Sequence, residues 1–304
     1  QIVAIGEEAK KMIGRTPLHI TVIRPLINGV ISDFEMTQEM LSFLFKRAVG
    51  PSNFFNYNKA VIGVPSNLTE VERKSVEDAV IGAGASKVYV VEEPLLAALG
   101  AKMPIDEPTS NLIIDIGGGT TEIAVISMGG IVNAKSIKTA GDKLNEDIVR
   151  FIRDEFHLAI GEPTAEELKI NIGSALPLDQ KMDLPIRGRD MATGLPREVI
   201  VRDIHIRAAI SKSLKIITDS IKEVIETTPP ELVGDVLKRG IFICGGGSLL
   251  KGIDKLVEKE ITVATTIIDD PLTCVARGAG MIAEDLTKYS YLVNNPLRPK
   301  EIKI

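Results

Sequence analysis

The sequence predicts an α/β protein with two related lobes around a cleft. Strands alternate with helices along the chain, and a glycine triplet twice follows a buried, apolar strand, at Gly117–Gly119 and Gly245–Gly247. Residues 103–110 contain two prolines and two acids without periodicity, which marks a connection between two parts. Two α/β lobes around a cleft are the simplest architecture that accounts for this repetition.

The composition limits the functions that are open to the chain. Its 304 residues, 44% of them hydrophobic, are enough for two domains with cores of their own. The 36 basic and 41 acidic residues are mixed and give a net charge of -5, so no basic stripe is available for nucleic acid. Two cysteines without a CxxC spacing and three separated histidines indicate neither a disulfide framework nor a zinc site. We expect a cytosolic protein without a nucleic-acid partner.

Apolar spacing and capping signals define the elements of the first part. Thr69 and Glu72 form a capping box, so a helix begins there. Pro94 suits the first turn of another helix, and Asn28-Gly29 predicts a tight turn. In order, we predict a strand at 1–6, a helix at 7–13, a strand at 19–23, a helix at 37–49, a strand at 59–64, a helix at 69–82, a strand at 87–92 and a helix at 95–102.

The second part begins with two strands on either side of the first glycine triplet. A polar strand-and-turn insert that ends near residue 201 predicts a small subdomain, and Pro229-Pro230 end a long amphipathic helix. In order, we predict a hairpin at 111–127, a strand at 131–137, helices at 143–156 and 165–172, the insert, a helix from about 210 to 228, a helix at 231–238, a strand at 240–244 and a helix at 249–258.

The first glycine triplet carries a pattern suited to phosphate. Asp115 ends an apolar strand, so its carboxylate lies at the strand end where α/β sheets bind ligands. Backbone N–H groups of Gly117–Gly119 can approach an anion without hindrance from Cβ atoms, and Thr120 and Thr121 add hydroxyls. Asp115 can hold Mg²⁺ through its waters. A simple tight turn would also use glycine, but the recurrence of the triplet favours phosphate binding.

The second triplet is followed by Ser248 and by a predicted helix. A helix N-terminus there would present free N–H groups to a ligand. The loop can hold a phosphate or lie against the base and sugar of a nucleotide, and both alternatives stay open. Neither triplet is a Walker loop, because no Gly-Lys-Ser/Thr follows.

Glu92 and Glu93 lie between a strand and the helix that Pro94 begins. Acidic residues are favoured at a helix N-terminus by the helix dipole, which is a structural explanation. The functional alternative is a carboxylate that orients or deprotonates a water that attacks a γ-phosphate. Because the two side chains face opposite ways, only one of them can point into the cleft.

Three strings together resemble the actin, sugar-kinase and heat-shock-chaperone ATPase superfamily: Asp115-Ile-Gly-Gly-Gly-Thr-Thr-Glu122, Glu92-Glu-Pro94 and Gly245-Gly-Gly-Ser248. Within it, nearly the whole chain is similar to the MreB family of bacterial actin homologues. Five further strings carry this closer resemblance: Ile5–Lys10, Arg24–Val30, Thr69–Arg73, Thr228–Leu232 and Asp270–Ala276.

The resemblance implies an actin-like ATPase fold with four subdomains, which binds ATP or ADP with Mg²⁺ between its lobes, hydrolyses ATP and polymerises head to tail into paired protofilaments. By similarity, Glu93 positions the attacking water with help from Thr120, and Asp115 helps to hold the magnesium ion. The other nucleotide contacts that it implies are Gly117, Gly118, Gly119, Glu166, Glu167, Lys169, Gly245, Gly246, Gly247 and Ser248.

The resemblance also assigns the subdomains. It implies part of subdomain IB at 1–27, IA at 28–107, IIA at 108–143 and 209–277, IIB at 144–208, and a C-terminal segment that returns to IA at 278–304. Two departures from the family pattern stand out. The first phosphate hairpin, of the Asp-Leu-Gly-Thr type, is expected before Gln1, and Asn145 stands where the family often has an acid.

Phe54 and Phe55 are adjacent in a polar loop, beside Lys46, Arg47 and Lys59. Exposed rings next to basic groups suit a membrane surface, and MreB proteins are similar in having a hydrophobic loop at about this place. The alternative is that the loop folds back onto the first lobe. We expect a cytoplasmic protein at the inner face of the cell membrane, with the filament adding many weak anchors together.

The resemblance favours a filament-forming cytoskeletal ATPase with a role in cell shape, whose partners are further copies of the chain, the membrane and other shape-determining proteins. A small-molecule kinase of the same superfamily is the alternative, and it would need a sugar-binding acid between the lobes. A chaperone-type ATPase would need a peptide-binding domain, for which too few residues follow Cys274.

Overall fold

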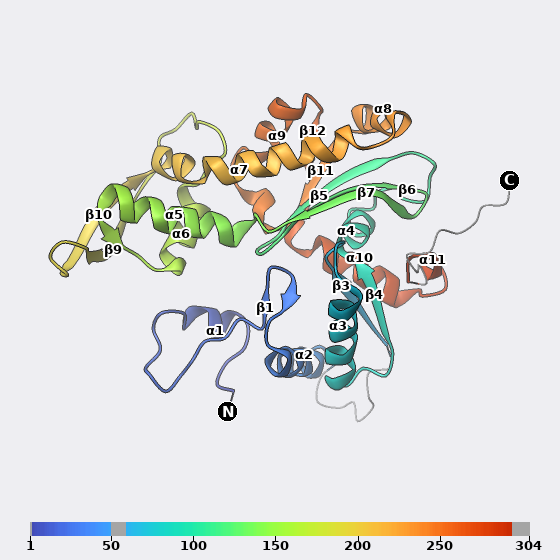
Figure 1. Ribbon diagram of the computed structural model, residues 1–304, viewed down its shortest axis with the longest axis horizontal. Coiled ribbons are helices and arrows are strands. Elements are labelled where there is room, and N and C mark those ends of the chain that lie inside the picture. The colour runs from blue at the N-terminus through green and yellow to red at the C-terminus, as the bar shows by residue number, and fades with distance from the viewer. Residues whose placement is uncertain (1, 50–58, 294–304) are drawn as a thin grey trace.

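The computed structural model describes residues 2–49 and 59–293. The predicted membrane residues Phe54 and Phe55 lie outside the described residues. Two groups of elements lie side by side and are joined near their middle (Figure 1). We call residues 2–107 the first lobe and residues 108–270 the second lobe.

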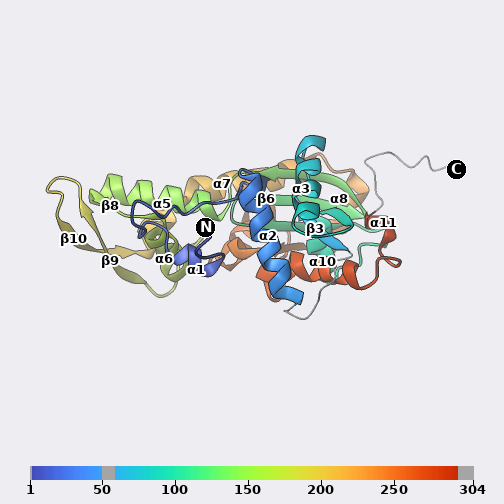
Figure 2. The same ribbon diagram turned by 90° about the horizontal axis from the view of Figure 1, so that it is seen from below.

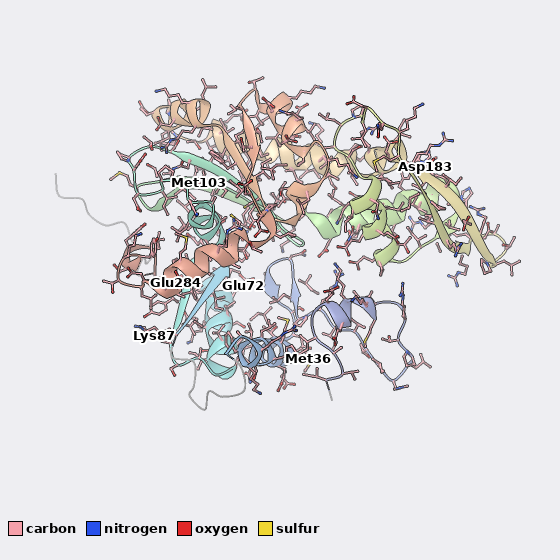
Figure 3. All side chains as sticks on the ribbon, turned by 180° about the vertical axis from the view of Figure 1, so that it is seen from behind. Met36, Glu72, Lys87, Met103, Asp183 and Glu284 are labelled. Carbon is pink, nitrogen blue, oxygen red and sulfur yellow. The ribbon has the colours of Figure 1, made fainter. Side chains whose placement is uncertain are left out.

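The first lobe is built on a short parallel pair of strands. Strands β3 and β4 pair from Ala60 with Val88 to Val64 with Glu92, so both end at the same edge. The predicted capping box is present, because Thr69 and Glu72 exchange hydrogen bonds at the start of α3 (Figure 3 labels Glu72). The elements are α1 (Glu7–Lys11), β1 (Leu26–Ile27), β2 (Val30–Ile31), α2 (Phe34–Val49), β3 (Ala60–Val64), α3 (Glu70–Gly82), β4 (Val88–Glu92) and α4 (Glu93–Gly100).

The second lobe contains a five-stranded sheet in the order β12-β11-β5-β6-β7. Strand β11 runs parallel to β5 and β12, whereas β5, β6 and β7 are antiparallel neighbours. Its strands are β5 (Asn111–Ile116), β6 (Thr121–Ser127), β7 (Gly130–Ile137), β11 (Ile241–Cys244) and β12 (Thr265–Ile267), and the helices beside them are α7 (Asp203–Glu226), α8 (Pro230–Arg239) and α9 (Ile253–Ile261).

A smaller three-stranded sheet lies at the far end of the second lobe (Figure 2). Its strand order is β10-β9-β8, and β9 and β10 form the hairpin that the polar insert predicted. The elements here are α5 (Gly141–Phe156), β8 (Leu158–Ala159), α6 (Glu162–Ile172), β9 (Asp183–Asp190) and β10 (Pro196–Arg202). The subdomain boundaries stay predictions.

The five-stranded sheet separates two apolar cores. Because side chains alternate along a strand, Leu112 and Ile114 face α5, α6 and α7, while Ile113 faces α4 and α10. Met103 belongs to the second of these cores and is buried (Figure 3). Each fully buried Leu or Ile contributes about 1.5–3 kcal/mol relative to an exposed one. The second core therefore fixes the first lobe against the sheet of the second.

The chain returns to the first lobe after η2 (Pro271–Thr273). Helix α10 (Cys274–Glu284) packs on α4, and a short α11 (Ser290–Val293) follows. A Cβ at Gly100 would stand 1.9 Å from the carbonyl oxygen of Cys274, and one at Gly278 would stand 2.0 Å from that of Leu96. These glycines allow the two helix backbones to touch. In the described part of the chain, no helix is long and apolar enough to cross a bilayer.

Three sequence predictions were wrong. Residues 2–5 and 19–23 are not strands, because an alternating pattern forms a strand only when a partner strand pairs with it, and neither segment is paired in the described ranges. The helix expected at 249–258 begins at Ile253. The last two glycines of the second triplet and the two residues after them form a 3-10 turn, η1 (Gly246–Leu249).

Candidate functional site

Four strands end at the same place between the lobes. Parallel pairing aligns the ends of β3 and β4 in the first lobe and of β5 and β11 in the second, where Cys244 lies beside Asp115. Ligands of α/β proteins bind at the carboxyl ends of such strands. The sequence-predicted residues Asp115, Glu93 and Gly245 lie at these ends.

The first glycine hairpin is a closed turn held by its own backbone. Gly117 donates to the carbonyl of Thr120 at 2.9 Å, and Asp142 at the start of α5 donates to the carbonyl of Gly118 at 2.8 Å. The hydroxyl of Thr121 donates to the carbonyl of Thr139 at 2.8 Å, so Thr121 has a structural role. Among the described residues the hydroxyl of Thr120 has no hydrogen-bond partner and stays available to a ligand.

The first lobe contacts this hairpin through the predicted Asn28-Gly29 turn. Both residues have a positive φ, 51° and 75°, as a two-residue hairpin turn requires. A Cβ on Gly119 would stand 2.8 Å from Cα of Asn28, and one on Gly29 would stand 3.5 Å from Thr120. The hairpin tip is therefore in direct contact with both lobes.

Three carboxylates face one another beneath the hairpin. Burial raises the pKa of Glu93 to about 8, with further contributions from Asp115 and Glu122. Burial also raises the pKa of Asp115 to about 6, and Glu122 adds to that shift. Among the described residues no cation lowers the pKa of Glu93 or Asp115, and such buried, unpaired carboxyl groups are typical of sites that bind a cation or move a proton.

The two adjacent glutamates differ in their surroundings. Burial raises the pKa of Glu93, and the charges of Asp115 and Glu122 both add to that shift. Burial and the charge of Glu122 also raise the pKa of Glu92, but the positive charge of Arg73 opposes that shift. Asp115 therefore acts on Glu93 and Arg73 on Glu92.

The second glycine loop packs on the end of β5, directly before the first loop. A Cβ on Gly245 would stand 2.2 Å from Oδ1 of Asp115, and one on Gly247 would stand 2.2 Å from Cγ2 of Ile116. Ser248 donates to the carbonyl of Gly245 from its backbone at 3.2 Å and from its hydroxyl at 2.7 Å. The expected helix N-terminus with free N–H groups is absent here, because the chain forms a 3-10 turn that uses some of these donors itself.

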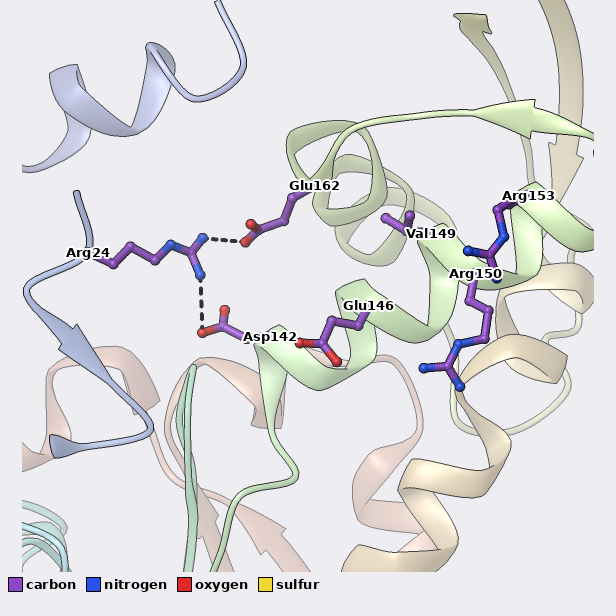
Figure 4. Close-up of a pocket in the computed structure, with 7 residues that line it drawn as sticks. All are labelled: Arg24, Asp142, Glu146, Val149, Arg150, Arg153 and Glu162. Carbon is purple, nitrogen blue, oxygen red and sulfur yellow. Dashed lines mark hydrogen bonds and ion pairs between the residues drawn. The ribbon is translucent and has the colours of Figure 1, made fainter. Parts of the chain in front are cut away.

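Charged residues from both lobes meet beside this site. Arg24 of the first lobe contacts Asp142 at 3.5 Å and hydrogen-bonds Glu162 (Figure 4). Lys10 forms a second pair across the lobes, with Glu166 at 3.0 Å. A cavity of about 440 Å³ opens next to these contacts and is lined by Arg24, Asp142, Glu146, Val149, Arg150, Arg153 and Glu162.

Helix α6 carries the remaining predicted contacts, and they do not share one face. Lys169 donates to the carbonyl of Gly141 at 2.9 Å, and burial lowers its pKa. Glu166 lies one turn before it and faces Lys10. Glu167 is exposed and lies off this face. The structure thus brings Glu166 and Lys169 toward the hairpin and leaves Glu167 outside.

Sequence reasoning missed several residues that the structure places at the site. Arg24, Asp142 and Glu162 come from distant segments, and their mutual contact has no local signal. Glu122 did have a local signal in the sequence, because a single carboxylate in an otherwise apolar strand is unusual. Asn145, which stands where the family often has an acid, is buried in α5, and its Oδ1 has no hydrogen-bond partner among the described residues.

Residues 1–291 match the family model described as MreB/Mbl protein. The chain belongs to the MreB/Mbl family. It is 44% identical to the cell shape-determining protein Mbl of Bacillus subtilis (strain 168) over 288 residues. These residues make up 95% of this chain and 86% of that protein. It is 41% identical to the cell shape-determining protein MreB of Escherichia coli (strain K12) over 283 residues. These residues make up 93% of this chain and 82% of that protein.

Solved structures agree with this assignment to the MreB/Mbl family. The crystal structure of MreB 5 of Spiroplasma citri bound to AMPPNP superposes with a TM-score of 0.90 at 39% identity, over 95% of this chain and 86% of that one. A MamK double helical filament gives a TM-score of 0.78 at 25% identity, over 93% and 85% of the two chains. The predicted actin-like fold is confirmed. This MreB/Mbl chain is an actin-like cytoskeletal protein of an ATPase family.

Proposed function

We propose that this chain binds ATP and ADP between its lobes, hydrolyses ATP and polymerises into filaments in a nucleotide-dependent way. The observation that carries the proposal is the contact of the second glycine loop, Gly245–Gly247, with Asp115 and Ile116, the strand end that leads into the first glycine loop. Solved relatives bound to AMPPNP and to ADP support the choice of ligand.

The hairpin tip is suited to hold phosphates. Gly118 is exposed, and Gly117 and Gly119 are half-buried, so part of the backbone of the tip is accessible to a ligand. Lys169 adds a cation close to Gly141, at the base of the same turn. On the other side, Glu166 and Lys169 are proposed to contact the ribose and base, with Gly245–Ser248 forming the second wall.

The carboxylate oxygens of Asp115 are ligands of the kind that Mg²⁺ prefers. No group of three or more His, Cys, Asp or Glu side chains in the described ranges is arranged to hold a metal ion. Mg²⁺ does not need such a group, because it keeps several waters and uses one or two carboxylates plus phosphate oxygens. Asp115 would hold it through this water shell, and bound Mg²⁺ supplies neutralisation of phosphate charge.

Glu93 and Thr120 are proposed to handle the attacking water. The raised pKa of Glu93, about 8, makes its carboxylate a stronger proton acceptor than an ordinary glutamate. The hydroxyl of Thr120 stands on the hairpin tip and is free to hold the same water. Glu93 is fixed at the start of α4, whose residues from Pro94 to Gly100 are all buried, so the carboxylate has a rigid base.

The filament is proposed to act at the inner face of the cell membrane, in the cytoplasm. The names of its relatives, which are cell shape-determining proteins, and a MamK double helical filament among its structural neighbours support the filament; the place at the membrane rests on the sequence pattern of the loop that contains Phe54 and Phe55. Phe54 and Phe55 are the proposed membrane anchors. Other shape-determining proteins are proposed partners.

Sedimentation of the purified chain tests the proposal. With ATP at micromolar protein concentration we expect pelletable polymer and release of inorganic phosphate, and with the apo protein neither. A small-molecule kinase would instead transfer phosphate to a sugar. Sugar phosphorylation without sedimentable polymer, under any nucleotide or lipid condition, would reject the cytoskeletal function.

A further inference from the structure

We propose that Glu122 is a positioning residue that ties the two lobes together at the hydrolytic site. The inference rests on the proposed function, since it concerns the alignment of Glu93 with the hairpin. Glu122 lies in β6, and it is the cross-strand partner of Asp115 on β5 and of Ser136 on β7. Nothing in the proposed chemistry uses its carboxylate directly.

The burial of Glu122 demands an explanation. Its side chain is 1% exposed, and an unpaired charge at such a position is strongly unfavourable. No cation forms an ion pair with it in the described ranges. Its neighbours on the same face of β6, Ala124 and Ile126, pack against α4 and α10. The carboxylate therefore stands at the polar end of the apolar contact between the lobes.

Hydrogen bonds from both lobes satisfy this carboxylate. Ser66 of the first lobe donates to Oε2 twice, from its backbone N at 3.2 Å and from its hydroxyl at 2.7 Å. Ser136 of the second lobe donates its hydroxyl to Oε1. One oxygen is thus held from its own sheet, and the other reaches across to the first lobe.

Ser66 lies two residues beyond β3, where the first lobe approaches the site. The last residue of β3, Val64, pairs with Glu92, the neighbour of Glu93. Pro65 lies against the Asn28-Gly29 turn, since a Cβ on Gly29 would stand 2.6 Å from its ring. Holding Ser66 on Glu122 therefore fixes the strand ends that carry Glu93 relative to the strands that carry Asp115 and Thr120.

The ion pairs between the lobes are more exposed than this contact. Arg24 and Asp142 have side chains 43% and 47% exposed, and the side chain of Lys10 is 59% exposed. Exposed ion pairs add little to stability and are screened by salt. Glu122 is buried and Ser66 is half-buried, so their hydrogen bonds are better shielded from water than these ion pairs.

Four variants of the full chain test whether Glu122 links the two lobes, which we call the tether, or only stabilises the fold. Glu122→Gln keeps an oxygen for Ser66 and an amide that can donate to Ser136, whereas Glu122→Ala removes both contacts. Ser66→Ala weakens only the contact between lobes. Ser136→Ala is the matched control, because it removes a hydroxyl from the same carboxylate within one lobe.

We expect Glu122→Ala to lower kcat for ATP hydrolysis by about 10-fold or more, since small displacements of reacting groups are costly. Nucleotide Kd should change by less than about 3-fold, because the phosphate-binding hairpin keeps its own backbone bonds. The kcat of Ser66→Ala should lie between those of the parent chain and Glu122→Ala. The kcat of Glu122→Gln and of Ser136→Ala should stay near that of the parent chain. Equal losses in Ser66→Ala and Ser136→Ala, or a Gln variant as slow as the Ala variant, would overturn the tether.

Amide hydrogen exchange gives a second readout that needs no hydrolysis. The backbone N–H of Ser66 donates to Glu122, so a peptide covering residues 61–68 should lose protection in Glu122→Ala and keep it in Glu122→Gln. Unchanged protection in Glu122→Ala would refute the tether even if the chain proved not to hydrolyse ATP. If Glu122→Ala loses this protection and Glu122→Gln keeps it, but the parent chain has no ATPase activity, only the proposed function is rejected.

Discussion

Gly245 lies against Asp115, although 130 positions separate them in the chain: a Cβ on Gly245 would stand 2.2 Å from Oδ1 of the carboxylate. This contact holds the second glycine loop against the end of β5, the strand that leads into the first glycine loop. Gly245 also has a φ of 80°, a conformation that other residues adopt only with strain. Both properties make the position specific for glycine.

Gly245→Ala is therefore expected to lower the free energy of unfolding by about 2 kcal/mol or more, through strain and overlap together. Nucleotide affinity should fall as well, because Asp115 would be displaced. Urea denaturation and nucleotide titration measure the two effects. Gly234→Ala is the matched control: Gly234 lies in α8 with nothing within 4 Å of a Cβ, so alanine there should stabilise by about 0.5–1 kcal/mol. Equal behaviour of the two variants would contradict this prediction.

Glu93→Ala should slow ATP hydrolysis by about 100-fold or more while nucleotide Kd stays nearly unchanged, because a general base acts on the water rather than on the nucleotide. Phosphate release under saturating ATP is the measurement. The adjacent Glu92→Ala serves as the control: Arg73 opposes the effect of burial on the pKa of that carboxylate, and we expect this change to leave the rate within a few-fold. Loss of ATP binding in Glu93→Ala would argue that Glu93 has a structural role.

The raised pKa of Glu93 predicts a pH dependence of stability in the nucleotide-free protein. The folded state holds a proton on Glu93 up to a pH of about 8, whereas the ordinary pKa is 4.5. Between these values the folded state binds more protons than the unfolded state, so the free energy of unfolding falls as pH rises. The contribution is fully present below pH 4.5 and is lost as pH rises through about 8.

Glu93→Gln removes this titration. Relative to the parent chain, we expect the variant to gain about 1 kcal/mol or more at pH 9 and much less at pH 5. Urea denaturation at both pH values, without nucleotide or Mg²⁺, is the measurement. A difference between the two proteins that does not vary with pH would show that Glu93 ionises normally in the folded state.

Changing both Phe54 and Phe55 to Ser should reduce binding to liposomes that contain anionic lipid and leave ATPase activity in solution unchanged, because the rings are proposed to insert at the interface. Co-sedimentation with liposomes is the measurement. Phe34→Ser provides a control, since Phe34 is an exposed phenylalanine, 41% accessible, at the start of α2. Liposome binding that survives the double change would reject the membrane role of this loop.

Much of the fold followed from local sequence patterns. The capping box at Thr69 begins α3, Pro94 lies in the first turn of α4, and the glycine triplet between two apolar runs forms the tip between β5 and β6. Each of these signals acts within a few residues, so the sequence carries it completely. The strand expected at 19–23 failed for the opposite reason, because a strand depends on a partner that no local pattern supplies.

The chain by itself determined the two-lobed α/β class and the pair of glycine loops, and it predicted Asp115 and Glu93 as site residues. Only the tertiary structure decided that Asp115 and Glu122 both act on Glu93, that the second glycine loop is a 3-10 turn, and that Glu122 meets Ser66. These relationships depend on how strand ends from separate lobes are brought together, and burial then turns ordinary carboxylates into groups with raised pKa values. Local sequence encodes the elements, whereas the long-range packing of α4 and α10 on the five-stranded sheet sets the distances between them.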